Sequence, residues 1–456
     1  MHNDGTELAQ TRSGQPIPLQ LRPPILETRD IPACLSTGLS LKANVSWTFA
    51  GQVVYAGCQW GMLTVLAKLV SPEMVGRFCL GLAVTAPIIM FSQLHLRGVQ
   101  ATDARREYAF GHYLALRLTT TGFALLAIAA VTFVSGYRGE AAWVILAIGL
   151  FKGVESVSDA YHGLMQQRER MDRIALALMI KGPLFLVALA LAVGLTGNVL
   201  WGVVAMLPPS LVVLMGYERP NARLLLRDEP QAIRPLWQWR RLVILARLAL
   251  PLGVVMMLIS LNTNVPRYFI EHMLGERELG YFGALAYLVV AGNTVVLAMG
   301  QSASPRLARH FAAGDFQHYR KLLLRLVGLG ALLGLGGIAI ALLAGKPLVT
   351  LLYGSEYAEN QQAFLWLMVS ACLSYIASCL GYAMTAARRF AAQLPLFAMV
   401  TATTGVASFF LIPRLGLSGA AVALGLGAIA QVAGSEFVVS KALKSRLRET
   451  DCHDKT

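Results

Sequence analysis

The sequence has few charged residues. Asp, Glu, Lys and Arg make up 14% of its 456 residues, whereas soluble globular proteins contain about 25%. In contrast, 56% of the residues are hydrophobic, and the mean hydropathy is +0.57. This balance excludes an ordinary soluble domain and indicates an integral membrane protein.

Motifs of the common catalytic and metal-binding classes are also missing. The sequence contains no Gly-rich phosphate loop followed by Lys and Ser or Thr, and no His-Glu-x-x-His motif. Its six cysteines stand singly, without the spacing of a metal site or of a disulfide framework. The polar connectors are too short to hold a folded catalytic domain. We therefore expect no cofactor, no metal site and no enzymatic activity.

Long apolar runs dominate the rest of the sequence. A helix that crosses a bilayer needs about 20 mostly apolar residues. Twelve windows meet this requirement: 44–68, 77–98, 113–135, 141–164, 173–195, 199–217, 246–265, 279–301, 323–344, 361–385, 391–412 and 418–440. Residues 1–42 are polar and Pro-rich and lack the apolar core of a signal peptide, so we expect a disordered N-terminal tail.

The basic residues predict how the chain is oriented. The loops that follow even-numbered spans hold 16 Lys and Arg residues, whereas those that follow odd-numbered spans hold five. Because cytoplasmic loops retain basic residues, both termini are predicted to be cytoplasmic. The net charge of +14 is explained by this topology, and we expect no nucleic-acid partner.

An internal duplication runs through the apolar windows. SPEMVGRFCLGLA at 71–83 resembles GERELGYFGALA at 275–286, and YRGEAAWVILAI at 137–148 lies opposite YGSEYAENQQAFLWL at 353–367. Further weak matches follow in the same order. They favour two six-helix halves with a cavity between them, an architecture that moves solutes by alternating access. The alternative is chance similarity between spans rich in Leu, Ala and Gly.

The duplication and the apolar windows together predict an all-α integral membrane fold of about 12 helices in two six-helix bundles. The predicted parts are a cytoplasmic N-terminal tail (1–42), an N-terminal bundle (43–217), a cytoplasmic linker (218–244), a C-terminal bundle (245–440) and a cytoplasmic C-terminal tail (441–456).

The fourth window carries charges in its middle. On a helical wheel, Lys152, Glu155, Asp159 and His162 form one polar stripe that runs toward the cytoplasmic end. A charge at this depth costs at least about 2.5 to 3.5 kcal/mol on insertion scales. The stripe must therefore face protein or water.

Three further cations lie in the first half. Lys181 is deep in the fifth window, and Arg97 and Arg117 lie nearer the cytoplasmic ends of the second and third windows. Two interpretations remain open for these groups. Either the charges pair and hold helices together, or they line a water-filled cavity that receives an anionic substrate. In the second interpretation Glu155 and Asp159 are candidates for ion coupling.

Three stretches of the sequence resemble one known family. They are NVSWTFAGQVVYAGCQWGMLTVLAKLVSPEMVGRFCLGLAVTAPIIMFSQLHLRG, ESVSDAYHGLMQQRERMD and PRYFIEHMLGERELGYFGALAYL. Together they look like the Wzx-like polysaccharide repeat-unit flippases, and the resemblance covers residues 40–440. This family belongs to the superfamily that includes the multidrug and toxin extruders, whose two six-helix bundles face each other in a V shape.

The resemblance implies a bacterial inner-membrane transporter. Its substrate would be an undecaprenyl-pyrophosphate-linked oligosaccharide, flipped by alternating access for the synthesis of O-antigen, capsule or exopolysaccharide. The partners implied are membrane lipids, with a polysaccharide polymerase and a chain-length regulator as candidates. Within this frame Lys152, Lys181, Arg97 and Arg117 would be the ionic partners of the substrate, in company with Glu155, Asp159 and His162.

Two other functions fit a chain with about a dozen spans. A multidrug extruder would share the fold, but deep lysines argue against a preference for cationic drugs. An integral membrane glycosyltransferase or ligase would need a sizeable periplasmic loop with catalytic groups, and the sequence offers none of that size.

Overall fold

The computed structural model describes residues 41–103, 107–227, 233–387 and 392–453. The predicted disordered tail lies almost entirely outside these ranges. Within them all regular secondary structure is helical, and no strand occurs. The all-α fold predicted from the sequence is therefore confirmed.

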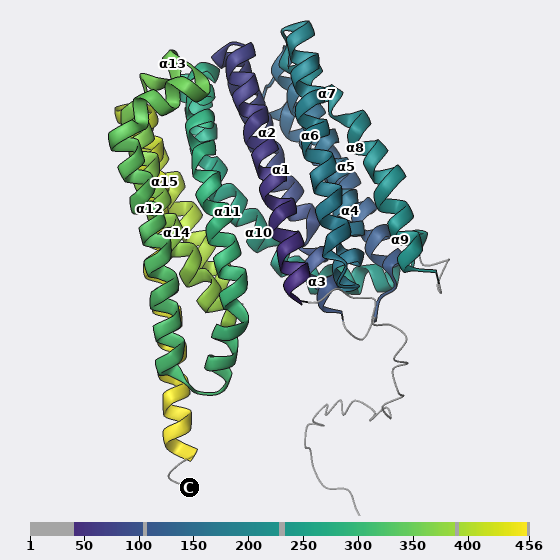
Figure 1. Ribbon diagram of the computed structural model, residues 1–456, viewed down its shortest axis with the longest axis vertical. Helices are drawn as coiled ribbons and strands as arrows, with labels where there is room; N and C mark the ends of the chain where they lie inside the picture. Colours follow the sequence, from purple (N-terminus) through teal and green to yellow (C-terminus); the bar gives the residue numbers. More distant parts are fainter. Residues whose placement is uncertain (1–40, 104–106, 228–232, 388–391, 454–456) are drawn as a thin grey trace, which may run out of the picture. The chain divides into compact units, whose positions relative to one another are not determined.

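The first six predicted spans correspond to a series of helices (Figure 1). These are α1 (Leu41–Leu69), α2 (Pro72–Gln93) continued by α3 (Leu96–Thr102), α4 (Phe110–Val134), α5 (Gly139–Gln167), α6 (Met171–Thr196), and the stretch made of α7 (Val199–Ala205), α8 (Leu207–Val213), the π-helix η2 (Leu214–Glu218) and α9 (Arg219–Leu225). The sixth helical stretch thus continues past residue 217, where the sequence predicted the bundle to end.

The last six predicted spans correspond to five long helices and one short one. These are α10 (Trp239–Leu274), α11 (Glu276–Ala312), α12 (Phe316–Tyr353), the short α13 (Ser355–Ala358), α14 (Gln361–Ala386) and α15 (Gln393–His453). Two predicted spans fall in α15, which is interrupted at Gly416, where φ is 57° and ψ is −135°. In the described residues ten helical stretches are long and apolar enough to cross a membrane.

Local sequence signals explain where several helices begin. Pro72 occupies the first turn of α2, where its missing N–H costs nothing. Asn198 accepts a hydrogen bond from the Leu200 N–H (2.8 Å) at the start of α7. Asp315 accepts one from the His318 N–H (3.1 Å) at the start of α12. Side-chain acceptors of this kind satisfy N–H groups that have no partner inside the helix.

The helices pack as two groups that also contact each other. In the first group α1 packs on α6, and α5 packs on both α2 and α4; in the second, α14 packs between α12 and α15, and α10 packs on α15. The green and yellow helices α12, α14 and α15 lie together in Figure 1. The groups are joined because α2 packs against α10 and α11.

A reciprocal glycine contact lies at the crossing of α2 and α11. A Cβ atom added to Gly76 would overlap the carbonyl oxygen of Glu276, and one added to Gly280 would overlap the carbonyl oxygen of Pro72. When the repeated motifs are aligned on Gly76 and Gly280, Pro72 matches Glu276. The two copies of the motif therefore make equivalent contacts with each other. Only glycine permits so close a backbone approach.

Candidate functional site

The best-connected group of buried charges centres on Lys181 of α6. Its side chain is 0% exposed, and Nζ lies 3.0 Å from Glu155 Oε1 and 2.8 Å from Glu218 Oε1. It also donates a hydrogen bond to Ser158 Oγ (2.6 Å), and Glu155 Oε1 accepts another from Ser210 Oγ (2.8 Å). We call Lys181, Glu155, Glu218 and His162 the lysine cluster.

His162 completes this cluster. Its Nε2 lies 2.9 Å from Glu218 Oε1, and both side chains are almost fully buried. With a neutral imidazole the cluster would carry one positive and two negative charges. An excess charge in a buried environment is costly. A proton on the imidazole, or on one carboxylate, would make the cluster neutral.

A second charged group lies nearby on α5. Asp159 is shared by two cations: Arg117 Nη2 lies 2.9 Å from Oδ2, and Arg97 Nη1 lies 3.4 Å from Oδ1. Arg97 Nε also donates to Gln166 Oε1 (2.8 Å). The Arg117 side chain is 0% exposed, whereas that of Arg97 is 29% exposed. We call Arg97, Arg117 and Asp159 the arginine cluster.

Both clusters contain buried polar atoms without a hydrogen-bond partner among the described residues. These atoms are Nε and Nη1 of Arg117 and Oε2 of Glu218. Such atoms are rare in folded proteins. The clusters therefore have hydrogen-bonding capacity beyond the contacts that the described chain supplies.

Lys152 belongs to neither cluster. It lies one residue from the midpoint of α5, its side chain is partly exposed, and its Nζ lies 5.6 Å from the centroid of the Phe151 ring. No carboxylate of the described chain forms an ion pair with it: Glu155, the acid that interacts with it electrostatically, is paired with Lys181, and Asp159 is paired with the arginines. Lys152 is therefore a cation with accessible surface at the middle of a membrane-length helix.

The structure thus divides the single stripe predicted from the wheel. Glu155 and His162 face α6 and η2, and Asp159 faces α3 and α4. Of the seven predicted site residues, Lys181, Glu155 and His162 come together in one cluster, and Arg97, Arg117 and Asp159 in the other. Lys152 stands apart from both.

Glu218 is a site residue that the apolar pattern does not reveal. The apolar window ends just before it, so the sequence predicts that it lies in the cytoplasmic linker. In the structure the helix continues through η2, and Glu218 is 0% exposed against Lys181 and His162. A π-helical turn is uncommon and frequently accompanies a functional site. The sequence signal that points to Glu218 is a single acid directly after an apolar run.

Ion pairs also connect the two groups of helices. Arg77 at the start of α2 contacts Glu140 of α5 and, at 2.8 Å, Glu276 of α11. Arg277 of α11 lies 3.7 Å from Glu73 of α2 and 3.6 Å from Glu356 of α13 (Nη2 to Oε2). In the repeat, Glu140 and Glu356 occupy matching positions. Each arginine therefore joins an acid of its own half to an acid of the other half.

Among the described residues, no group of three or more His, Cys, Asp or Glu side chains is arranged to hold a metal ion. The chemistry available in the two clusters is ion pairing and proton binding.

Known proteins resemble this chain in both sequence and fold. Residues 41–311 match the family model described as "Polysaccharide biosynthesis protein". The capsular polysaccharide biosynthesis protein CapF of Staphylococcus aureus is 25% identical over 383 residues, which cover 84% of this chain and 94% of CapF.

Two solved structures have a similar fold. A MOP superfamily transporter from Pyrococcus furiosus aligns with a TM-score of 0.60 and 16% identity, over 88% of this chain and 95% of its own. A point mutant of the Vibrio cholerae MATE transporter VcmN aligns with a TM-score of 0.60 and 14% identity, over 89% and 96% of the two chains.

The matched family model covers more than half of the chain, and the helices and the structural relatives agree with it. The chain is a multi-pass, all-helical membrane protein with a fold like that of solved MOP superfamily transporters, and it belongs to the polysaccharide biosynthesis protein family.

Proposed function

We propose that this chain is a transporter that flips an undecaprenyl-pyrophosphate-linked oligosaccharide across the bacterial inner membrane, for the synthesis of O-antigen, capsule or exopolysaccharide. The observation that carries the proposal is Lys152. A cation at mid-span with no carboxylate partner in the described chain costs at least about 2.5 to 3.5 kcal/mol. A negatively charged substrate group would offset that cost when it binds.

The other charged residues divide into two roles. Arg97 is partly exposed and shared with Asp159, so it can turn to a substrate anion alongside Lys152. Lys181 is paired with two carboxylates and Arg117 with one, both cations are fully buried, and in this conformation they hold α5 in place. Protonation of Glu155 or Asp159 would release one of these cations, which keeps both acids as candidates for ion coupling.

Transport would proceed by alternating access. The Arg77–Glu276 and Arg277–Glu73 pairs connect the two groups of helices at one end, and these pairs must break before the substrate can leave there. The sugar head group would pass between the helix groups while the lipid tail stays in the bilayer. No covalent bond is made or broken.

The positive-inside pattern supports the rest of the proposal. It orients both termini toward the cytoplasm, where the lipid-linked sugar is built. A polysaccharide polymerase and a chain-length regulator are candidate partners after translocation.

A multidrug or toxin extruder is the alternative of the same fold. The solved relatives support it only through the fold, because their identities to this chain are 14 to 16%. Lys152 favours the anionic substrate, since an unpaired cation would repel a cationic drug.

The test is translocation of a fluorescent undecaprenyl-pyrophosphate oligosaccharide in proteoliposomes. We expect the wild type to move the lipid, Lys152→Ala to lower the rate at least tenfold, and Lys152→Arg to retain part of it. Lys346→Ala, which removes an exposed lysine of α12, is the matched control and should move the lipid at the wild-type rate.

Folding of each variant is checked by a thermal melt. Equal rates for the wild type and a well-folded Lys152→Ala would remove the role given to Lys152. No movement by the wild type, together with export of a cationic dye, would favour the extruder.

A further inference from the structure

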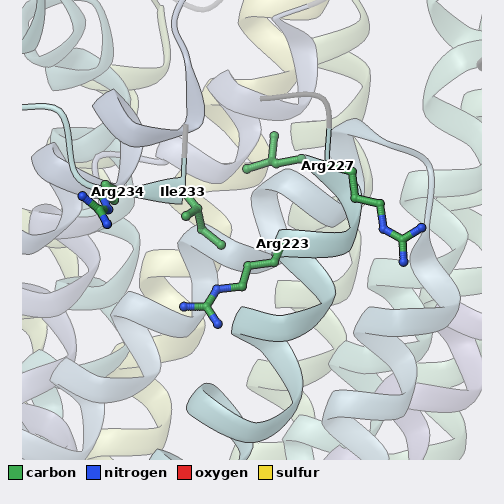
Figure 2. A pocket seen from close by; sticks show the side chains of 5 residues that line it. Arg223, Arg227, Ile233 and Arg234 are labelled. Carbon is green, nitrogen blue, oxygen red and sulfur yellow. The ribbon is translucent and has the colours of Figure 1, made fainter. Parts of the chain in front are cut away.

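A pocket of about 400 Å³ lies where the sixth helical stretch ends. It is lined by Arg223, Leu226, Arg227, Ile233 and Arg234. Figure 2 shows the guanidinium groups of Arg223 and Arg234 on the same side as Ile233, whereas that of Arg227 extends to the other side. Three cations and two aliphatic side chains thus line one hollow, and no acid of the described chain belongs to the lining.

The apolar part of this pocket is anchored in the protein core. Leu226 is buried in a cluster with Phe110, Leu114 and Tyr161, and Ile233 packs against the same cluster. The arginines therefore project from a fixed base. An anchored backbone loses less freedom when a ligand binds than a loose loop does.

The segment that carries Arg234 is held against α4 by its backbone. The Leu236 N–H donates to the Gly111 carbonyl oxygen (2.9 Å), and a Cβ atom at Gly111 would overlap the Arg234 carbonyl oxygen. His112 Nε2 and Gln238 Oε1 lie 3.2 Å apart. Glycine at 111 is what allows this segment to lie so close to the helix.

The side chains of the three arginines have no ion pair or hydrogen bond to any residue in the described parts of the chain. Arg223 lies in the last turn of α9, Arg227 lies just beyond its end, and Arg234 lines the same pocket, so three like charges that repel one another border one hollow. An anion in the pocket would relieve this repulsion. The planar guanidinium group matches the oxygen atoms of phosphate particularly well.

The pocket also lies close to where the chain meets the bilayer surface. One membrane-length stretch ends at Leu225, and the next begins at Trp239. Trp237, just before this stretch, and Trp239, its first residue, are 50% and 62% exposed, and their ring centroids are 6.2 Å apart. Exposed tryptophans are enriched at the level of lipid head groups, which is where phosphate groups are concentrated.

We propose that this arginine pocket binds a phosphate group at the membrane surface. The phosphate belongs either to an anionic lipid head group or to a soluble phosphate or pyrophosphate compound. The proposal does not depend on which substrate the transporter carries, because none of its residues belongs to the lysine or arginine cluster.

The experiment measures binding to the full-length protein in a neutral detergent. The probes are short-chain phosphatidylglycerol, the same chain length of phosphatidylcholine, and inorganic pyrophosphate, each titrated and followed by native mass spectrometry. We expect Arg223→Ala and Arg234→Ala each to weaken phosphatidylglycerol or pyrophosphate binding about fivefold, because a basic residue at an anionic surface contributes a free energy of that order.

Arg240→Ala is the matched control, because Arg240 is an exposed arginine in the first turn of α10, close to the connector, and does not line the pocket. It should bind the probes as the wild type does. Asp228 and Glu229 follow Arg227 in the sequence, so Asp228→Asn/Glu229→Gln is included, and we expect it to bind the probes at least as tightly as the wild type.

The outcomes distinguish the two sources of phosphate. Binding of phosphatidylglycerol but not pyrophosphate assigns the pocket to a lipid head group, and the reverse assigns it to a soluble compound. Wild-type affinity for both probes in the Arg223→Ala/Arg234→Ala double variant overturns the proposal. An equal loss in Arg240→Ala also overturns it, because the effect would then come from general surface charge.

Discussion

Removing the charge of Lys181 should destabilise the fold strongly. The substitution Lys181→Met keeps an unbranched side chain in place but leaves Glu155 and Glu218 without their shared cation, which lies 3.0 Å and 2.8 Å from them. Breaking a buried ion pair from one side typically costs about 3 to 5 kcal/mol, because the remaining charge stays buried. We expect a loss of that size in the free energy of unfolding.

A double-mutant cycle isolates the contact from other effects of the substitution. Glu218→Gln removes one of the two negative charges that Lys181→Met leaves unpaired and keeps the side-chain shape. The double variant Lys181→Met/Glu218→Gln should therefore lose less free energy of unfolding than the sum of the losses in the two single variants. Contacting groups in one network show interaction energies of about 0.5 to 3 kcal/mol, and we expect a value near the top of this range.

The assay is equilibrium unfolding in mixed micelles, followed by tryptophan fluorescence. Lys346→Met is the control, because this exposed lysine should change stability by about 0.5 kcal/mol or less. A Lys181→Met variant within about 1 kcal/mol of the wild type would refute the reasoning, since leaving the buried carboxylate of Glu218 without its lysine costs more than that. An additive double variant would show that the two side chains are not coupled.

Two further predictions concern the α2–α11 crossing and the start of α12. Gly76→Ala should destabilise the fold by about 1 to 3 kcal/mol or more, because its Cβ would overlap the Glu276 carbonyl oxygen. Gly328→Ala, where the Cβ would meet open space, should be neutral or slightly stabilising; equal unfolding free energies for these two variants would contradict the close crossing. The His318 backbone N–H, together with the His318 side chain, lowers the pKa of Asp315 below its usual value. Asp315 therefore stabilises the fold above the unfolded pKa of about 3.9, and this contribution is lost as the pH falls through the lower folded pKa. The stability difference between the wild type and Asp315→Ala, measured by thermal melts from pH 6 downward, should shrink on acidification, and a constant difference would rule out the carboxylate as its source.

The sequence located the helices well because the bilayer imposes a simple rule. Each span must be long and apolar, so composition alone marks it, and the windows at 113–135 and 173–195 coincide closely with α4 and α6. The pair of windows on either side of Gly416 shows the same agreement, although the structure joins them into α15. Local cues such as Pro72 and Asp315 also mark helix starts.

The partners of the charged residues could not be read in the same way. A helical wheel gives the direction of Glu155 and Asp159 relative to each other, but it does not say which neighbouring helix lies on each side. Glu155 contacts α6, and Asp159 contacts α3 and α4. These choices depend on packing between helices, which one sequence does not contain.

Glu218 was missed for a related reason. Hydropathy assigns an acid at the end of an apolar run to a loop, whereas its burial requires a counter-ion on another helix. Lys181 supplies that counter-ion, and the π-helical turn of η2 accompanies the contact. The arginine pocket likewise depends on where Gly111 allows the connector to lie.

The reciprocal contact of Gly76 and Gly280 also bears on how the protein is made. The two glycines are about 200 residues apart, and ribosomes add about 5 to 20 residues per second, so α2 is synthesised about 10 to 40 seconds before its partner. During this interval the glycine-bearing face of α2 is uncovered within the membrane. An insertion factor or chaperone that shields nascent spans would cover this face of α2 until α11 is made.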